Sequence, residues 1–223
     1  MKEVTTKFFL FSELSEEAKK KAIKNNSEIC FYYGWDRNVI EEEQERLETL
    51  GLSNVEIFYS GFYSQGDGAC FTGDIDNDGL VKFMCGVDEK GVKLSDKYRA
   101  VYDSICGREE HNIHVNIKIT HSGHYYHEYM TSTNDYSELQ TGEEMTGDLL
   151  KEWQAFMTFF DNRVYELGNN PLTGSSRHGW LIDCNRAIYK ALETENEYLA
   201  SDESIIEYFE NNDVYFTSEG EIE

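Results

Sequence analysis

The sequence predicts an α+β protein, on the basis of three observations. Two pairs of β-rich segments are each joined by a short glycine-containing turn, which is typical of antiparallel hairpins. Apolar residues recur at helical spacing before these segments and through the last third of the chain. The 223 residues are enough to bury a sizeable core. We therefore predict a single domain over residues 1–223, in which an antiparallel sheet built from two hairpins plus terminal strands packs against about five helices, with residues 143–223 as a candidate helical subdomain.

The chain is predicted to begin with a strand and two helices. Residues 4–11 (VTTKFFLF) are rich in β-forming residues. The hydroxyl of Ser15 can cap the first helix, and two glutamates follow it in the first turn, where negative charge is favourable. The second helix is predicted from about residue 36, and Gly51 provides the residue that ends it.

The middle of the chain is predicted to hold two hairpins and one further strand. The turn of the first hairpin is SQGDG, residues 64–68, and the turn of the second is Ser122-Gly123. Before the second turn, isoleucine and valine alternate with polar residues, which indicates a half-buried strand. The predicted strands are residues 55–63, 69–75, 80–85, 113–119 and 124–131.

The last third is predicted to be mainly helical. Apolar residues at helical spacing run from Leu149 to Leu167, and the sequence GNNP, which begins at the next residue, ends this helix. A further helix is predicted around residues 181–192, and Ser201 can cap a short helix after it. A last strand over residues 214–217 precedes an acidic tail.

Charge is the property that most restricts the partners. The chain has 43 aspartate and glutamate residues against 20 lysine and arginine residues, which gives a formal net charge of −23. Such a surface repels nucleic acid and anionic membranes, so we expect neither as a direct partner. It suits a protein partner with a basic surface, a cation, or solubility alone. The sequence leaves the oligomeric state open, and it predicts no cofactor.

The cysteines and the N-terminus indicate a cytoplasmic protein. The five cysteines are odd in number and no two have C-x-x-C spacing, so we expect free thiols in a reducing compartment rather than disulfides or a zinc site. The N-terminus has only a short apolar stretch before acidic residues, so we expect no signal peptide. No apolar run approaches the length of a membrane span.

The C-terminal stretch carries charge of one sign, because no lysine or arginine follows Lys190. A solvated surface is the simplest interpretation of such a run. The functional interpretation is a docking surface for a basic groove that normally holds nucleic acid, since electrostatic steering favours such a partner. The candidate partner-binding residues are Glu193, Glu195, Glu197, Asp202, Glu203, Glu207 and Glu210.

The SQGDG turn and the residues after it form a candidate ligand site. A glycine-rich turn can hold an anion, but Asp67 would repel phosphate, and a plain hairpin turn is the simpler interpretation. If the two hairpins are neighbours in one sheet, Cys70 could act as a nucleophile with His124 or Glu128 as its base. A buried core cysteine is again the simpler interpretation, so we predict no catalytic set and keep these three residues as candidates. The candidate ligand-binding residues are Gln65, Asp67, Gly68, Cys70 and His124.

Two patterns could bind a metal ion, although we predict no metal site. Three alternating aspartates precede a glycine as D-x-D-x-D-G, which is how a calcium loop begins, but the twelfth position is a cysteine rather than a glutamate. An acidic turn explains this pattern more simply. On either side of the second turn, His121 and His124 could join Glu128 as ligands, or belong to an exposed sheet face. The calcium candidates are Asp74, Asp76 and Asp78.

Several short segments, spread over most of the chain, form a recognisable pattern. The most specific is SGF-x-SQGDGA-x-F at residues 60–71; weaker matches are FSELSEEAK at 11–19, HSG at 121–123, YHE at 126–128 and EYL-x-SDE at 197–203. This pattern resembles an uncharacterised family found in bacteriophages and prophages, some members of which are labelled "antitoxin of a toxin–antitoxin stability system". The resemblance implies a phage origin and a bacterial host cell, and it brings no catalytic residues. His124 departs from the pattern, in which a basic residue such as arginine is expected.

Three functions are therefore expected. The first is a non-enzymatic, phage-derived protein that binds and inhibits a host protein, a defence or nucleic-acid-handling factor, with carboxylates replacing phosphates on a basic surface. The second is a protein or enzyme that binds a small molecule or nucleotide derivative in a pocket between the two hairpins, at SQGDGAC. The third is an antitoxin that neutralises a toxin by direct contact, which differs from the first only in the genetic origin of the partner.

Overall fold

The computed structural model describes residues 7–85, 116–134 and 179–223, together with residues 147–148, 150–151, 153–155, 158, 167–168 and 176–177. The chain forms two compact units. The first, here the terminal unit, comprises Met1–Val39 and Ala191–Glu223, and the second, here the sheet unit, comprises Ile40–Lys190. The single domain and the helical subdomain at residues 143–223 remain predictions.

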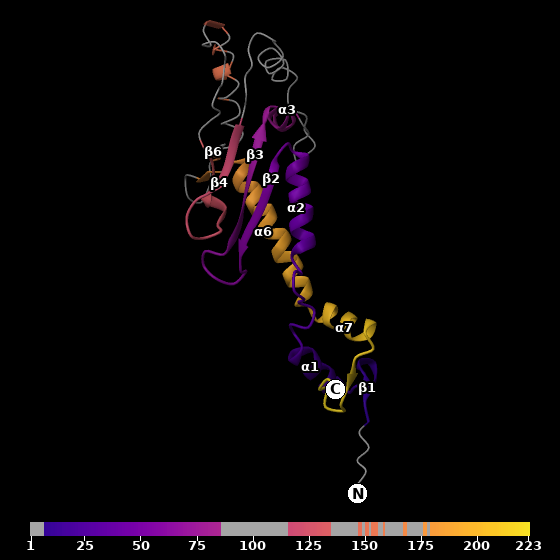
Figure 1. Cartoon of the computed structure of the whole chain (residues 1–223). Helices are drawn as coiled ribbons and strands as arrows, with labels where there is room; N and C mark the ends of the chain where they lie inside the picture. Colours follow the sequence, from indigo (N-terminus) through magenta and orange to yellow (C-terminus); the bar gives the residue numbers. More distant parts are fainter. Residues whose placement is uncertain are drawn as a thin grey trace. The chain divides into compact units, whose positions relative to one another are not determined.

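The terminal unit is built from both ends of the chain. Strand β1 (Phe9–Leu10) pairs antiparallel with β8 (Tyr215–Phe216), as Figure 1 shows for β1 and the yellow C-terminal segment. A 3-10 helix η1 (Phe11–Glu13) and the helices α1 (Glu16–Asn25) and α7 (Asp202–Asn211) complete it. The predicted terminal strands therefore pair with each other in their own two-stranded sheet, rather than extending the larger sheet.

Two predicted helix caps are confirmed in the terminal unit. The Ser15 hydroxyl accepts a hydrogen bond from the Ala18 amide at 3.3 Å, and the Ser201 hydroxyl accepts one from the Ser204 amide at 3.2 Å. Each bond satisfies one of the amides that a helix leaves unpaired at its start. The core beneath these helices contains three phenylalanine rings, whose centroids lie 4.9–6.1 Å apart. These rings belong to Phe11, Phe209 and Phe216.

The sheet unit contains a four-stranded antiparallel sheet in the order β2-β3-β4-β5. Pairing of β3 with β4 joins the two predicted hairpins into one sheet, with Ile75 opposite Ile117 and Gly73 opposite Ile119. The α+β class with antiparallel sheets is thus confirmed. The strands are β2 (Ser53–Ser60), β3 (Gly68–Asp76), β4 (Asn116–His121) and β5 (Thr131–Asn134).

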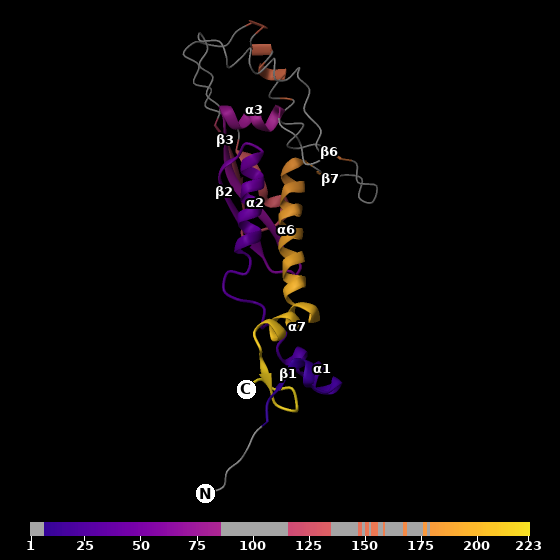
Figure 2. The same ribbon diagram turned by 90° about the vertical axis from the view of Figure 1, so that its right-hand side faces the viewer.

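Helices cover one face of this sheet. Figures 1 and 2 show α2 (Arg37–Thr49) and α6 (Trp180–Leu199) side by side along the strands. The Trp180 ring packs edge-on against Phe71 of β3, at a centroid distance of 5.9 Å, and the Gln44 amide of α2 donates a hydrogen bond to the Val55 carbonyl of β2. Alternate residues of the inner strands are buried on this side, so one face holds the core and the other is partly open. The fully buried sheet residues include Phe71, Ile75, Ile117 and Ile119.

Two predicted strands are wrong. Residues 80–85 belong to the helix α3 (Asn77–Cys85), because the Asp76 carboxylate accepts a hydrogen bond from the Gly79 amide at 2.8 Å and caps it. A short apolar run does not by itself distinguish a strand from a buried helix. The predicted return strand 124–131 is instead a loop that ends in the 3-10 helix η2 (Glu128–Met130), and β5 begins only at Thr131.

The segment after residue 146 agrees with the prediction only in part. Asp148, Leu150, Lys151, residues 153–155 and Thr158 are helical, as the apolar spacing predicts. The predicted end of that helix is wrong, because β6 (Leu167–Gly168) pairs antiparallel with β7 (Ser176–Arg177). Residues 113–115 of the predicted strand 113–119 lie outside the described residues.

Candidate functional site

The SQGDG segment is a turn that its own aspartate holds together. The Asp67 carboxylate accepts hydrogen bonds from the amides of Tyr63 at 2.8 Å and Ser64 at 2.6 Å, and the Asp67 amide donates to the Ser64 carbonyl. Gly66 has a φ of +100°, which favours glycine. Gln65 lies exposed at the tip. The carboxylate of Asp67 thus shapes the turn, and this supports the hairpin interpretation of the motif.

Gly68 brings this turn into contact with the histidine- and tyrosine-rich loop 122–130. A side-chain carbon at position 68 would lie 2.8 Å from the carbonyl oxygen of Tyr126 and 3.1 Å from the Cα of His127. Only glycine leaves room for the loop to cross β3 so closely. The structure therefore places together the two segments that the sequence identified as a candidate ligand site.

Cys70 has the wrong properties for a nucleophile. Its side chain is buried, and burial raises the pKa of its thiol to about 11. The thiol therefore stays protonated near neutral pH, whereas attack requires a thiolate. His124, its candidate base, is exposed on the loop. The burial fits the simpler interpretation of Cys70 as a small core residue.

A groove of about 490 Å³ lies on the sheet face opposite α6, between the strands and the loop 122–130. Tyr126 is central to it: its ring stacks on Phe58 at a centroid distance of 5.4 Å and also meets His121 at 5.3 Å. His124 is the one candidate ligand-binding residue among the groove's lining residues. The lining residues are Phe58, Thr72, Thr120, His121, Gly123, His124 and Tyr126.

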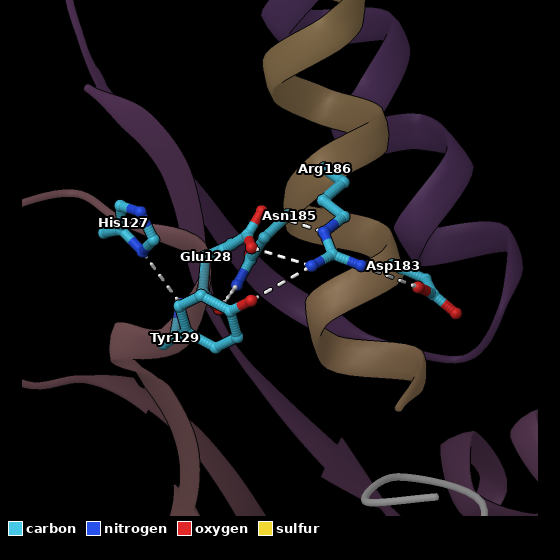
Figure 3. Close-up of polar contacts among 6 residues, drawn as sticks. All are labelled: His127, Glu128, Tyr129, Asp183, Asn185 and Arg186. Carbon is cyan, nitrogen blue, oxygen red and sulfur yellow. Dashed lines mark hydrogen bonds and ion pairs between the residues drawn. The ribbon is translucent and has the colours of Figure 1, made fainter. Parts of the chain in front are cut away.

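The loop that forms one wall of this groove is fastened to α6 by Arg186 (Figure 3). The guanidinium of Arg186 donates two hydrogen bonds to the two carboxylate oxygens of Glu128, at 2.8 and 2.9 Å, and a third to the Tyr129 hydroxyl at 3.1 Å. Asp183 lies at the outer limit of an ion pair, 4.0 Å from the same guanidinium. This two-pronged geometry fixes the orientation of the Glu128 carboxylate relative to the Arg186 guanidinium, as well as the distance between them.

Asn185 provides the second attachment of the loop. Its amide nitrogen donates to the Glu128 carbonyl and to the Thr131 hydroxyl, both at 2.9 Å, while its amide oxygen is buried with no hydrogen-bond partner within the described residues. The residue is fully buried, so these two bonds are shielded from water. We refer to Glu128, Thr131, Asn185 and Arg186 as the loop anchor.

The electrostatics of the anchor agree with its geometry. Burial alone would raise the pKa of Glu128, but hydrogen bonds from Arg186 and Tyr129, with the charges of Arg186 and His127, lower it overall. The hydrogen bond to Glu128 raises the pKa of Arg186. Both groups are therefore charged at neutral pH. The sequence identified Glu128 as a candidate base and a candidate metal ligand. Its carboxylate instead forms an ion pair with Arg186.

Sequence reasoning missed Asn185 and Arg186. One indication was present, since Asn185 follows Leu181 by four residues and therefore faces the same side of the helix as the apolar stripe. A polar residue at such a position requires a buried partner. The identity of the partner depends on the fold and could not be read from the pattern.

Three of the other metal candidates have structural partners, and Asp78 lies in the first turn of α3. The Asp74 carboxylate accepts a hydrogen bond from the Asn54 amide at 2.8 Å, and Asp76 caps α3. The ring nitrogen Nε2 of His121 forms a hydrogen bond with the Tyr125 carbonyl oxygen at 2.9 Å. Across the described part of the chain, no group of three or more histidine, cysteine, aspartate or glutamate side chains could hold a metal ion.

The candidate partner-binding residues all lie in the terminal unit, on the end of α6 and on α7. On α7, Glu203, Glu207 and Glu210 are exposed and follow one another at helical spacing, so they share one side of the helix. The Tyr198 hydroxyl donates to Glu207 at 3.1 Å, and this bond, with the charges of Glu207, Glu203 and Glu195, raises the pKa of Tyr198. We call the seven residues the acidic face: Glu193, Glu195, Glu197, Asp202, Glu203, Glu207 and Glu210.

Residues 35–202 match the model of a protein family described as a domain of unknown function (DUF8835). The chain belongs to the DUF8835 family. The matched region contains the four-stranded sheet, the groove and the loop anchor, whereas Glu203, Glu207 and Glu210 lie beyond its end. No curated protein and no solved structure matches the chain. Among the described helices, none is both long enough and apolar enough to span a membrane.

Proposed function

We propose that this DUF8835 protein is an acidic, phage-derived binding protein, which attaches through its acidic face to a basic surface of a bacterial host protein and blocks that surface. The observation that carries this proposal is the gathering of the acidic face on two successive helices of one compact unit. Carboxylates presented in this way can replace the phosphates of a nucleic acid on a defence or nucleic-acid-handling protein.

Glu207 and Glu210 of the acidic face oppose the stability of α7, whereas Asp202 and Glu203 lie in its first turn, where negative charge is favourable. Glu207 and Glu210 lie in the second half of α7, whose last turn has no basic residue, although the C-terminus of a helix favours positive charge. Glu203 and Glu207 are like charges four residues apart, an arrangement that costs about 0.2–0.5 kcal/mol. The negative charges near the end of α7 are therefore unfavourable for that helix, which supports a role for them in binding.

Tyr198 adds an aromatic element to the acidic face. Its side chain is 46% exposed and is held by Glu207. Exposed tyrosines contribute strongly to protein interfaces, because a rigid ring buries a large area at a small entropic cost. Tyrosine among carboxylates suits a lysine- or arginine-rich partner, since a cation can contact both.

The proposal is tested by affinity capture from host lysate with two matched variants. E203Q/E207Q/E210Q neutralises three charges of the acidic face. E41Q/E42Q/E45Q neutralises three exposed glutamates on α2, and so makes the same change in net charge elsewhere. We expect a basic protein to be captured by the wild type and the α2 variant and to be lost with the α7 variant. Equal capture by all three proteins would refute a role for the acidic face.

An antitoxin would use the same face against a toxin. This form of the proposal differs only in the genetic origin of the partner, and the same capture experiment identifies it when the recovered protein is encoded beside this chain. A phage or prophage origin rests on the sequence resemblance alone.

A second function is favoured by a different observation, the groove on the outer face of the sheet. It lies where the SQGDGAC hairpin meets the loop 122–130, and its size is within the range of small-molecule sites. We therefore keep the binding of a small molecule as the second candidate. Native mass spectrometry of the purified chain would reveal a retained ligand.

A further inference from the structure

We infer that the groove binds a planar aromatic ligand that carries an anionic group, of which a nucleoside monophosphate is the representative. This inference rests on the second candidate function and specifies its ligand class and binding residues. It is independent of the acidic face, which belongs to the other compact unit.

The walls of the groove are suited to a flat ring. Phe58, Tyr126 and His121 form a continuous series of rings, with Tyr126 between the other two at centroid distances of 5.4 and 5.3 Å. Phe58 and Tyr126 are nearly parallel, at an interplanar angle of 18°, and both are half-buried. A planar ligand can extend such a series by stacking, which is tolerant of the identity of the base.

The polar groups of the groove favour a heteroaromatic ligand over a hydrocarbon. Thr72 of β3 and Thr120 of β4 are the threonines of the lining. The Thr120 hydroxyl donates a hydrogen bond to the Ser132 carbonyl at 3.5 Å, and a hydroxyl that donates one bond can still accept another. Small-molecule sites commonly combine apolar walls with a few such polar groups. The edge of a nucleobase provides the matching donors and acceptors.

The imidazole N–H groups of the groove can donate hydrogen bonds to an anion, although the chain as a whole is strongly acidic. Among the described residues, the lining contains two imidazoles, His121 and His124, and no carboxylate. Two nearby carboxylates are already engaged, Asp67 by the backbone amides of its turn and Glu128 by Arg186. Glu56 is exposed and pairs with Thr72 across the strands, so we place the anionic group at the opposite end, beside His121 and His124.

The groove is built to keep its shape. Its loop wall is held to α6 by the two hydrogen bonds between Arg186 and the Glu128 carboxylate, and Gly68 allows the same loop to contact β3. Gly123 has a φ of +96°, a backbone conformation that favours glycine and is strained for other residues. A site that is formed before its ligand arrives loses less conformational entropy on binding.

Isothermal titration of the full chain with adenosine monophosphate, guanosine monophosphate, cytidine monophosphate and uridine monophosphate tests the inference. Adenosine and inorganic phosphate are titrated separately, because together they make up adenosine monophosphate. We expect one nucleotide to bind per chain, adenosine to bind less tightly, and phosphate alone not to bind. H124Q should reduce the preference for the nucleotide over adenosine.

The aromatic wall is tested with Y126L and F58L, each checked for native circular dichroism. We expect either variant to weaken nucleotide binding about tenfold, the effect typical of one stacked base. Y63L is the matched control, because Tyr63 is 85% exposed in the same unit and does not line the groove. Two variants are used so that one poorly folded protein does not decide the result.

Three outcomes would overturn the inference. The first is that no nucleotide binds at millimolar concentration, which would leave the acidic-face proposal untouched. The second is wild-type affinity for the nucleotide in both Y126L and F58L, which would place binding elsewhere. The third is that adenosine binds as tightly as its monophosphate, which would remove the anionic requirement while the small-molecule function remained.

Discussion

The loop anchor makes a strong prediction about stability, which a double-mutant cycle can measure. E128Q and R186Q each remove one charge of the ion pair while keeping a side chain of similar size, and E128Q/R186Q removes both. If the pair stabilises the fold, the free energies of unfolding lost in the two single variants will sum to more than the loss in the double variant. The excess is the coupling energy between Glu128 and Arg186.

The geometry of the pair sets the expected magnitude. Two charge-assisted hydrogen bonds of 2.8 and 2.9 Å join the side chains, and hydrogen bonds to charged groups contribute about 1.5–3 kcal/mol when shielded. The side chains are 36% and 23% exposed, so water screens part of this interaction, and fully exposed pairs contribute only about 0–1 kcal/mol. We therefore expect a coupling energy of about 1–2 kcal/mol.

The pH dependence of the pair has a definite sign. The pKa of Glu128 is lower in the folded protein than its ordinary value of about 4.3. Its contribution to the free energy of unfolding is therefore complete above that ordinary value and is lost as the pH falls through the folded pKa. The wild type should lose stability relative to E128Q in this acid range, whereas the two should show parallel behaviour from pH 6 to pH 8.

Urea denaturation followed by circular dichroism, at pH 7 and in steps down to pH 3, provides the measurement. The anchor would be refuted as a stabilising element by a coupling energy below about 0.3 kcal/mol, which is within the usual error of additivity. Equal acid sensitivity of the wild type and E128Q would refute the assignment of the pH effect to Glu128. R186K is a useful fourth variant, because it keeps the charge but loses the two-pronged geometry.

Three further predictions concern single residues. Ser201→Ala should lower the free energy of unfolding by about 1 kcal/mol in urea denaturation, because it removes the cap of α7, and Ser201→Asp should restore it. Phe209→Ala should cost about 3–5 kcal/mol in the same assay, because its ring is buried against two other phenylalanines, whereas Tyr33→Ala, at a fully exposed site, should cost almost nothing. Cys70 should react with iodoacetamide at pH 8 only after unfolding, since burial raises the pKa of its thiol to about 11, and rapid alkylation of native protein, read by peptide mass spectrometry, would contradict this.

The sequence predicted those parts of the fold that depend on local chemistry. Ser15 and Ser201 cap helices as predicted, because capping requires only a hydroxyl at the right place in the chain. The first hairpin follows from the glycines and Asp67 of its turn, which the structure explains through bonds between residues four or fewer positions apart. Local rules were sufficient for these elements.

The errors arose where tertiary contacts override local preference. The segment HYYHEYM is rich in β-forming residues, yet it forms a loop, because Arg186 and Asn185 of a distant helix hold Glu128 in η2. The sequence failed to predict the groove for the same reason, because tertiary contacts form it. The sequence identified Gly68 and His124, but it could not identify Phe58 or Tyr126, since their stacking depends on the register of three strands and the path of the loop.

The two proposed functions occupy separate units of the chain, which makes them separable by experiment. The groove lies within the region that matches the DUF8835 family, whereas Glu203, Glu207 and Glu210 of the acidic face lie beyond it. A groove that binds a nucleotide would therefore be a property to examine across the family. E203Q/E207Q/E210Q should leave nucleotide binding unchanged, and Y126L should leave partner capture unchanged. If either variant abolished both activities, the two sites would act as one, and the separate roles argued for them would be wrong.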